Sequence, residues 1–283
     1  MAIPGYIIES GAWKGRELLD LYRETHTPWA WHEELFRHAR DIGIVPFSTP
    51  FDAPSVDLLE SLGCEMYKVA SFEIEDIPLL RKIGSTGKQA VIGTGMTSLE
   101  GILKAREILL GAGAARVIAL HCVSSYPAKI SEMNLKRINV LFEHFDYVGL
   151  SDHSPGALAA GIATTLGARM IEKHLILDRS IATADSAFSS TPAEFKAMVD
   201  HCLLIDSMVN RILFTENPEK DSLPLRRSLY YSRDLKAGHV ITANDLKTAR
   251  PALGLSPAYF DALIGEVLTS DVAENSPVKL NNF

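Results

Sequence analysis

Residues 147–175 read YVGLSDHSPGALAAGIATTLGARMIEKHL, and this stretch decides the fold class. Two short apolar runs, 147–150 and 170–175, flank a segment whose apolar residues have the spacing of an amphipathic helix. A strand, a helix and a second strand in this order form a βαβ unit, in which the two strands run parallel. The stretch therefore predicts an α/β protein with a parallel sheet.

The same unit recurs along the first 180 residues. Apolar runs rich in β-branched residues start 22 to 31 residues apart, at 45–47, 67–70, 90–92, 116–120, 147–150 and 170–175. Polar residues predict helix starts at Asp52, Ser98 and Ser131, and glycines predict helix ends at Gly63, Gly113 and Gly167. Between them, Leu99, Ile102, Leu103 and Leu110 would share one helix face.

Polar residues follow all six predicted strands. They are Ser48-Thr49, Ser71-Phe72-Glu73, Thr94-Gly95-Met96, His121-Cys122, Ser151-Asp152-His153 and His174. A doubly wound sheet concentrates its ligand groups at one switch point, whereas a (β/α)₈ barrel distributes them over all its strand ends. The pattern favours a TIM (β/α)₈ barrel. Such a barrel needs eight strands, so we expect it to be incomplete, with two βα units missing at the N-terminal end.

The composition excludes several classes of protein. The chain has 283 residues, 47% hydrophobic and 22% charged, with a net charge of −7. It has no apolar run of membrane-spanning length and no electrostatic reason to bind nucleic acid. Three widely spaced cysteines suit a reducing cytosol, so we expect a cytoplasmic protein.

The pattern of residues changes after residue 214. We expect a barrel over 1–214, a polar linker over 215–225 and a small β-rich domain over 226–283. Four short runs predict strands in that domain, at 228–232, 239–242, 245–249 and 277–280.

His153 and His174 are the strongest candidates for chemistry. Each ends a strand, and the two strands follow each other in the chain, so the histidines should lie about one strand spacing, ~4.8 Å, apart. Neutral imidazoles placed in this way could hold a divalent metal and leave coordination positions open for substrate and water. Two histidines that are merely hydrogen-bonded in a polar barrel mouth explain the pattern at least as well.

Other candidates carry weaker signals. Lys68 interrupts an apolar strand, so it binds an anion, extends to solvent from an edge of the sheet, or pairs with Glu73. The turn at Thr94 could present backbone N–H groups to an oxyanion. His121 and Cys122 are adjacent on a strand and should point to opposite faces, which disfavours a nucleophile–base pair and places Cys122 in the core. The tryptophans near the start, at 13, 29 and 31, more often cover the edge of a core than form a cage.

Taken together, the motifs resemble the sialic acid (N-acetylneuraminate) synthase family. The similar stretches, in chain order, are Phe47-Ser48-Thr49-Pro50-Phe51-Asp52, Tyr67-Lys68-Val69-Ala70-Ser71, Thr94-Gly95-Met96, His121-Cys122-Val123-Ser124-Ser125-Tyr126-Pro127, Gly149-Leu150-Ser151-Asp152-His153 and Ile171-Glu172-Lys173-His174. Residues 27–32 and 185–189 look most like the pseudaminic acid synthase branch. The C-terminal part resembles the antifreeze-like (SAF) domain of that family.

This resemblance implies an activity and a role for each matching residue. The family condenses phosphoenolpyruvate with the open-chain aldehyde of an acetamido sugar and releases phosphate. His153 and His174 would hold the metal, Mn²⁺ first with Mg²⁺ or Co²⁺ as alternatives. The implied substrate-binding residues are Ser48, Lys68, Ser71, Thr94, Tyr126, Ser151 and Arg250, and the implied catalytic residues are Glu73, Asp152, Glu172 and Asp185. Arg250 would reach the partner's sugar in a domain-swapped homodimer.

Three departures from the family pattern leave alternatives open. Gly93 stands where serine is usual, Ala252 where glycine is usual, and the substrate-binding motifs of the family's first two strands are absent. The chain is then either a synthase with a shortened reading frame or a non-catalytic or complemented fragment of one. A metal-dependent aldolase or hydrolase would fit the histidine pair but not the small C-terminal domain.

Overall fold

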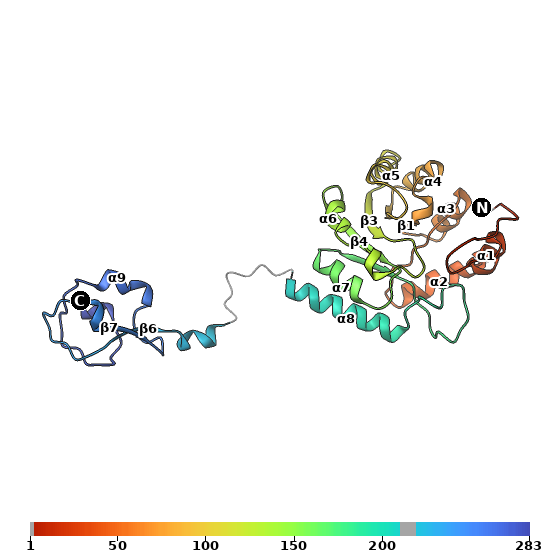
Figure 1. The fold of residues 1–283 in the computed structure, drawn as a ribbon. Helices are drawn as coiled ribbons and strands as arrows, with labels where there is room; N and C mark the ends of the chain where they lie inside the picture. Colours follow the sequence, from red (N-terminus) through yellow and green to blue (C-terminus); the bar gives the residue numbers. More distant parts are fainter. Residues whose placement is uncertain (1–2, 210–218) are drawn as a thin grey trace. The chain divides into compact units, whose positions relative to one another are not determined.

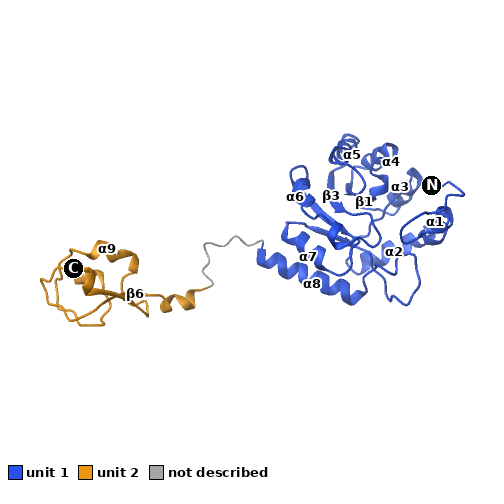
Figure 2. Cartoon of the chain, in the orientation of Figure 1, with its two compact units in different colours: residues 1–211 blue, residues 212–283 orange. Residues whose placement is uncertain are grey.

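Five parallel strands form a curled sheet in the first part of the chain, and helices lie around its outside (Figure 1). The computed structural model describes residues 3–209 and 219–283. The chain divides into two units, Met1–Arg211 and Ile212–Phe283 (Figure 2). The sheet has the strand order of the sequence, β1 (Met66–Val69), β2 (Gln89–Gly93), β3 (Arg116–Cys122), β4 (Val148–Asp152) and β5 (Met170–Lys173).

The described helices of this unit are three before the first strand and one after each of the five strands. They are α1 (Leu18–Thr25), α2 (Trp29–Asp41), α3 (Ala53–Ser61), α4 (Ile77–Gly84), α5 (Leu99–Gly111), α6 (Arg137–Phe142), α7 (Leu158–Thr165) and α8 (Pro192–Val209), with 3₁₀ turns η1 (Ser71–Glu73) and η2 (Ile130–Glu132). Asp52 caps α3 by accepting from the Ser55 amide, and Ser98 caps α5 by accepting from the Gly101 amide. Gly63, Gly113 and Gly167 follow helices with positive φ, as expected.

Three local predictions were wrong. Residues 45–47 form no strand, because Pro46 lacks an N–H for a ladder, and only Ser48 makes an isolated bridge, to Tyr67 of β1. Ser131 lies inside η2, and α6 starts only at Arg137. The buried face of α5 consists of Ile102, Ala105 and Leu109, whereas Leu99 and Leu110 are exposed.

The two faces of the sheet have different roles. Side chains alternate between them along each strand, and residues paired across a parallel ladder share a face. The outer face, which includes Tyr67, Ala90 and Val117, packs with the helices into the main core. The inner face starts with a small apolar cluster, Val91, Ile118 and Leu120. Toward the C-terminal ends of the strands, this inner face becomes polar.

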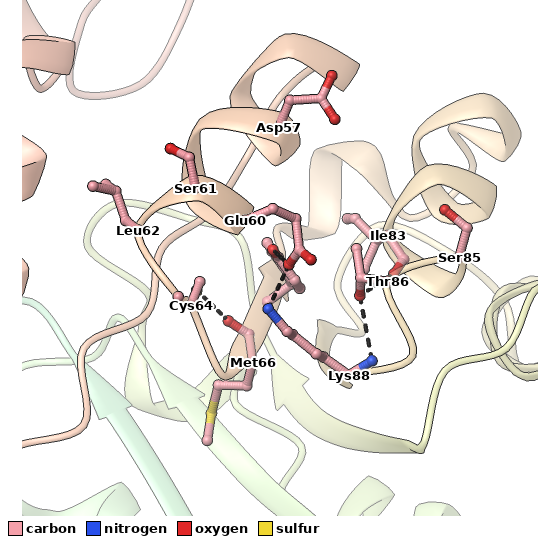
Figure 3. Close-up of polar contacts among 12 residues, drawn as sticks. Asp57, Glu60, Ser61, Leu62, Cys64, Met66, Ile83, Ser85, Thr86 and Lys88 are labelled. Atoms are coloured by element: carbon pink, nitrogen blue, oxygen red, sulfur yellow. Dashed lines mark hydrogen bonds and ion pairs between the residues drawn. The ribbon is translucent and has the colours of Figure 1, made fainter.

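Polar contacts also connect residues at the opposite end of the sheet, where the strands begin (Figure 3). Glu60 of α3 accepts a hydrogen bond from the Tyr67 hydroxyl and pairs at 2.6 Å with Nζ of Lys88, just before β2. Burial alone would raise the pKa of Glu60, but Lys88 and Tyr67 hold it below its ordinary value. Charge pairs at this end of a barrel contribute to stability rather than to chemistry.

The second unit has a core of its own. It contains β6 (Ser228–Tyr231) antiparallel to β7 (Leu246–Ala249), helix α9 (Phe260–Leu263) and the 3₁₀ turns η3 (Lys220–Leu225), η4 (Ala243–Asp245), η5 (Pro257–Tyr259) and η6 (Leu280–Asn282). Residues 239–242 and 277–280, expected as strands, make only isolated bridges, Val240 to Val267 and Pro277 to Tyr230. The expected linker starts at 215–218, outside the described residues, and ends in η3.

No helix within residues 3–209 and 219–283 combines the length and the apolar character that crossing a membrane requires.

Candidate active site

The strand register brings the polar residues of the inner face together. Ser151 of β4 pairs with Glu172 of β5, and its hydroxyl donates to Glu172 Oε1 at 2.6 Å. Lys68 of β1 lies on the same face, because it pairs with Val91, and its Nζ is 3.6 Å from the same Glu172 oxygen. Lys68 is therefore balanced by Glu172 and not by a contact with Glu73. The inner face thus carries a buried lysine that is paired with a carboxylate.

His153 and His174 follow β4 and β5 directly, on this same inner face. Their ring centroids are 5.4 Å apart. Nδ1 of His153 lies 2.9 Å from the Val123 carbonyl oxygen, and Nδ1 of His174 lies 3.2 Å from Oδ2 of Asp185. An oxygen acceptor at Nδ1 requires the proton there, so Nε2 of each neutral ring keeps its lone pair for a ligand.

Such an anchoring of Nδ1 is the usual arrangement behind metal-binding histidines, which present the other ring nitrogen to the ion. The donor set of His153 and His174 therefore fits a divalent cation. Among the residues that the structure describes, no group of three or more His, Cys, Asp or Glu side chains is arranged to hold a metal ion.

Cys122, for which the sequence predicted a position in the core, lies beside His153. Its sulfur is 3.8 Å from Nδ1 of His153 and 3.5 Å from the Ser124 hydroxyl. Burial alone would raise the pKa of the Cys122 thiol, but His153 and the nearby serines lower it to about 7. His121 points to the other face and contacts the Met133 carbonyl oxygen, so the two residues do diverge as expected.

Hydroxyl and amide groups gather around the end of β2. The Gly95 amide donates to the Ser71 hydroxyl at 3.1 Å. A Cβ built on Gly93 would lie 2.7 Å from Ser71 Oγ and 3.3 Å from Lys68 Nζ, so these two groups fill the space beside a glycine. The cationic Lys68 and the Ser71 hydroxyl thus meet where a small anion would find a charge and a donor.

Aromatic rings enclose the histidine pair. The Tyr126 ring centroid is 4.3 Å from that of His153 and 6.0 Å from that of His174, and Phe188 lies 5.2 Å from His174. Trp13 reaches the same cluster, 5.3 Å from Tyr126, and its indole N–H donates to the Ala184 carbonyl at 3.0 Å. Trp13 therefore belongs to the surroundings of the site, a placement that sequence spacing could not reveal.

Glu73 in η1 holds an unused acceptor. Its Oε2 is buried without a hydrogen-bond partner among the described residues. Burial first, and then the charge of Asp76, raise the pKa of Glu73 above its ordinary value, against the opposing effect of Lys68.

Two predicted site residues do not face the site. Thr94 is completely enclosed, and its hydroxyl donates to the Leu120 carbonyl at 3.0 Å. Asp152 pairs with Lys173 in the β4–β5 ladder, one position away from Ser151 and His153, and so lies on the outer face. Its carboxylate is enclosed and contacts Lys173 and Ser154. We therefore withdraw both from the set of groups that would touch a substrate.

The remaining predicted residues occupy separate places. Ser48 lies next to β1, where its carbonyl accepts from the Lys68 amide at 3.0 Å. Arg250 belongs to the second unit and is exposed directly after β7. The Tyr230 and Ser228 hydroxyls both donate to the carbonyl of the following Pro251, at 2.6 and 3.0 Å.

Comparisons with known proteins match both units. The NeuB family matches residues 4–212, and the SAF domain matches residues 226–283. Pseudaminic acid synthases from Campylobacter jejuni and Helicobacter pylori are 38% and 37% identical to the chain, over 98% of its length and 82% and 83% of theirs. A sialic acid synthetase structure from Leptospira borgpetersenii matches with a TM-score of 0.68 at 29% identity, covering 72% of each chain. The chain therefore belongs to the NeuB family and carries a SAF domain at its C-terminal end.

Proposed function

We propose that the chain condenses phosphoenolpyruvate with the open-chain aldehyde of a di-acetamido sugar, in the manner of a pseudaminic acid synthase. One observation carries this proposal: in a NeuB-family chain, the register of β4 and β5 sets His153 and His174 side by side, on the face that also carries Lys68. The similarity to pseudaminic acid synthases over 98% of the chain supports the substrate class.

Lys68 and Ser71 would receive the phosphoenolpyruvate. The substrate is an anion, and Lys68 supplies a positive charge on a side chain that is only 9% exposed. In such surroundings the attraction between charges is stronger than in water. Ser71, whose oxygen accepts from the Gly95 amide, lies beside it, and its hydroxyl would donate to the phosphate. Ser48, bridged to Tyr67 of β1, would be a further contact.

His153 and His174 would hold a divalent cation, for which we propose Mn²⁺, with Mg²⁺ or Co²⁺ as alternatives. When bound, such a cation polarises a carbonyl oxygen as a Lewis acid. Asp185 would keep the Nδ1 proton of His174 in place, and the Val123 carbonyl would do the same for His153. Tyr126 and the aromatic rings around it would limit the access of bulk water to the aldehyde.

The reaction balances without a further reactant. The methylene carbon of phosphoenolpyruvate forms a bond with the aldehyde carbon, and water adds to the resulting oxocarbenium carbon. The tetrahedral product then loses phosphate and becomes a 2-keto acid. The two protons of the water end on the new hydroxyl and on the phosphate. Glu73, with its unpartnered oxygen and raised pKa, would accept and pass on a proton of this water, and Glu172 would hold Ser151 and Lys68 in position.

The SAF domain would contribute Arg250 to the sugar of a partner subunit in a domain-swapped homodimer, and the enzyme would act in the cytoplasm. The hydrogen bonds of Tyr230 and Ser228 to Pro251 support a fixed loop at Arg250.

Phosphate release by the purified chain tests the proposal. The chain is supplied with phosphoenolpyruvate and Mn²⁺, together with the di-acetamido altrose derivative, with N-acetylmannosamine, or with no sugar. We expect release with the altrose derivative, and loss of that release when a chelator removes the metal. Release that does not depend on either sugar would contradict the condensation.

A further inference from the structure

Two buried charges meet on the outer face of the sheet, directly behind the histidine pair. Nζ of Lys173 lies 2.8 Å from Oδ2 of Asp152, and the two side chains are 2% and 0% exposed. Asp152 and Lys173 form the last pair of the β4–β5 ladder. The residue that follows each strand is one of the two histidines, so each member of the ion pair directly precedes a histidine in the chain.

The same charges also fix the turn after His153. Lys173 Nζ donates to the Ser154 carbonyl at 2.6 Å. The amide and the hydroxyl of Ser154 both donate to Oδ1 of Asp152, at 2.8 and 2.6 Å. His153 stands between these two residues, so its backbone is tied on both sides to Lys173.

A buried ion pair seldom adds much stability, because the loss of hydration opposes the attraction. Its best-attested role is to specify one arrangement of neighbouring elements. In this sheet, a slip of β5 against β4 would separate Lys173 from Asp152 and leave both charges unpaired. The same slip would pull His174 away from His153, since each histidine is covalently next to one member of the pair.

We infer that the Asp152–Lys173 ion pair, with Ser154, is a positioning device that holds His153 and His174 at the spacing needed to bind one divalent cation. This inference rests on the proposed function. It gives Asp152 a role behind the site in place of contact with the substrate. It also adds Lys173 and Ser154 to the residues on which the reaction depends.

Mn²⁺ binding to the full chain, followed by the electron paramagnetic resonance signal of the free ion, tests the inference without any turnover. The key variant is the double substitution Asp152→Leu/Lys173→Met, because apolar replacement of both partners usually preserves folding where loss of one does not. We expect a cooperative thermal melt without metal close to that of the wild type. Mn²⁺ binding should be weaker by roughly ten- to a hundredfold, as for other partners behind metal ligands. Wild-type affinity in this variant would overturn the inference.

Ser154→Ala covers the case in which the double variant does not fold. This substitution removes one hydrogen bond to Asp152 and leaves both charges in place. We expect a severalfold weaker Mn²⁺ affinity at an unchanged melting temperature. An affinity equal to that of the wild type would again contradict the inference.

Lys88→Met is the matched control, since it breaks the Glu60–Lys88 ion pair at the opposite edge of the sheet (Figure 3). We expect a lower melting temperature with unchanged Mn²⁺ affinity. If this variant loses affinity as much as the double variant, the effect is general destabilisation and the inference fails. A wild-type chain that takes up no Mn²⁺ would instead remove the metal site of the proposed function itself, and this inference with it.

Discussion

At the scale of single residues, the face of the strand decides what each polar side chain can do. Ser151 and His153 point inward, toward Glu172 and His174, while Asp152 between them points to the helices. Among residues 3–209 and 219–283, the acceptor beside each histidine faces Nδ1, and it is the Val123 carbonyl for His153 and Asp185 for His174. The proposed metal chemistry would therefore depend on Nε2 of these two residues.

Removing either imidazole should abolish metal-dependent turnover. We expect His153→Ala and His174→Ala each to reduce sugar-dependent phosphate release by at least about a hundredfold, because the remaining ring cannot hold the cation alone. The melting temperature of the metal-free chain should change little, and this serves as the control for folding. Substantial turnover in either variant would contradict the assignment of these ligands.

Glu73 should set the acidic limb of the pH profile. Burial and Asp76 raise its pKa, so Glu73 takes up a proton at a higher pH than an exposed glutamate does. If the ionised carboxylate accepts a proton from water, kcat/KM must fall as the pH drops through this raised pKa. Glu73→Gln should remove that limb and lower kcat by about a hundredfold or more.

The neighbouring exposed Glu75 supplies the control, because Glu75→Gln removes a carboxylate from the same segment. We expect its pH profile to match that of the wild type. An unchanged acidic limb in Glu73→Gln would show that another group accepts the proton.

The sequence indicated some of these residues, but it did not show on which face of a strand each side chain lies. His153, His174 and Lys68 were identifiable, because polar residues at strand ends and a lysine within an apolar strand are local signals. Thr94 and Asp152 were misplaced, because a motif match does not say which face of the strand a side chain occupies. Trp13 lies 171 positions from its hydrogen-bond partner Ala184, and no local pattern encodes such a contact.

At the scale of elements, the packing of β4 against its neighbours controls the spacing of the histidines. Five of the six predicted first-unit strands are confirmed, because their apolar runs fill both faces of a covered parallel sheet. The predicted strand at 45–47 did not form, because it contains a proline. The buried face of α5 was misjudged because a small residue, Ala105, occupies a buried position between Ile102 and Leu109. Helix caps at Asp52 and Ser98 were predictable from the side chains alone.

Gly149 in β4 is a sensitive position for this packing. A Cβ there would overlap the carbonyl oxygen of Met170 in β5 and lie 2.6 Å from Cδ2 of Leu120 in β3. Gly149→Ala should therefore destabilise the first unit by about 1–3 kcal/mol and lower its melting temperature by several degrees.

Gly111 at the end of α5 is the matched control, because a Cβ at that position meets no atom within 4 Å. Gly111→Ala should leave the melting temperature unchanged or raise it slightly. Equal effects of the two substitutions would mean that β3, β4 and β5 are packed less closely than they are in the structure.

At the scale of the whole molecule, the chain has two units with separate cores, and the proposed chemistry draws on both. The change of composition after residue 214 predicted a second domain, although the sequence could not show how short its strands are. The pseudaminic acid synthases match across both units.

Arg250→Ala tests the proposed contribution of the SAF domain. Loss of a charged hydrogen bond to the sugar should raise the KM for the sugar roughly tenfold or more, with a smaller effect on the KM for phosphoenolpyruvate. Lys247→Ala in β7, three residues before Arg250, removes a charge that faces Asn275 and should leave both KM values unchanged. Equal increases in the two KM values for Arg250→Ala would place Arg250 outside the sugar site.

The formation of a carbon–carbon bond is the central claim, and the fate of labelled phosphoenolpyruvate tests it most directly. The chain is incubated with Mn²⁺, the di-acetamido altrose derivative and phosphoenolpyruvate that carries ¹³C in its methylene group, and the products are separated and analysed by mass spectrometry and NMR. We predict that the label appears in a single larger keto acid, bonded to the former aldehyde carbon. Label found only in pyruvate or in unreacted phosphoenolpyruvate would contradict the account.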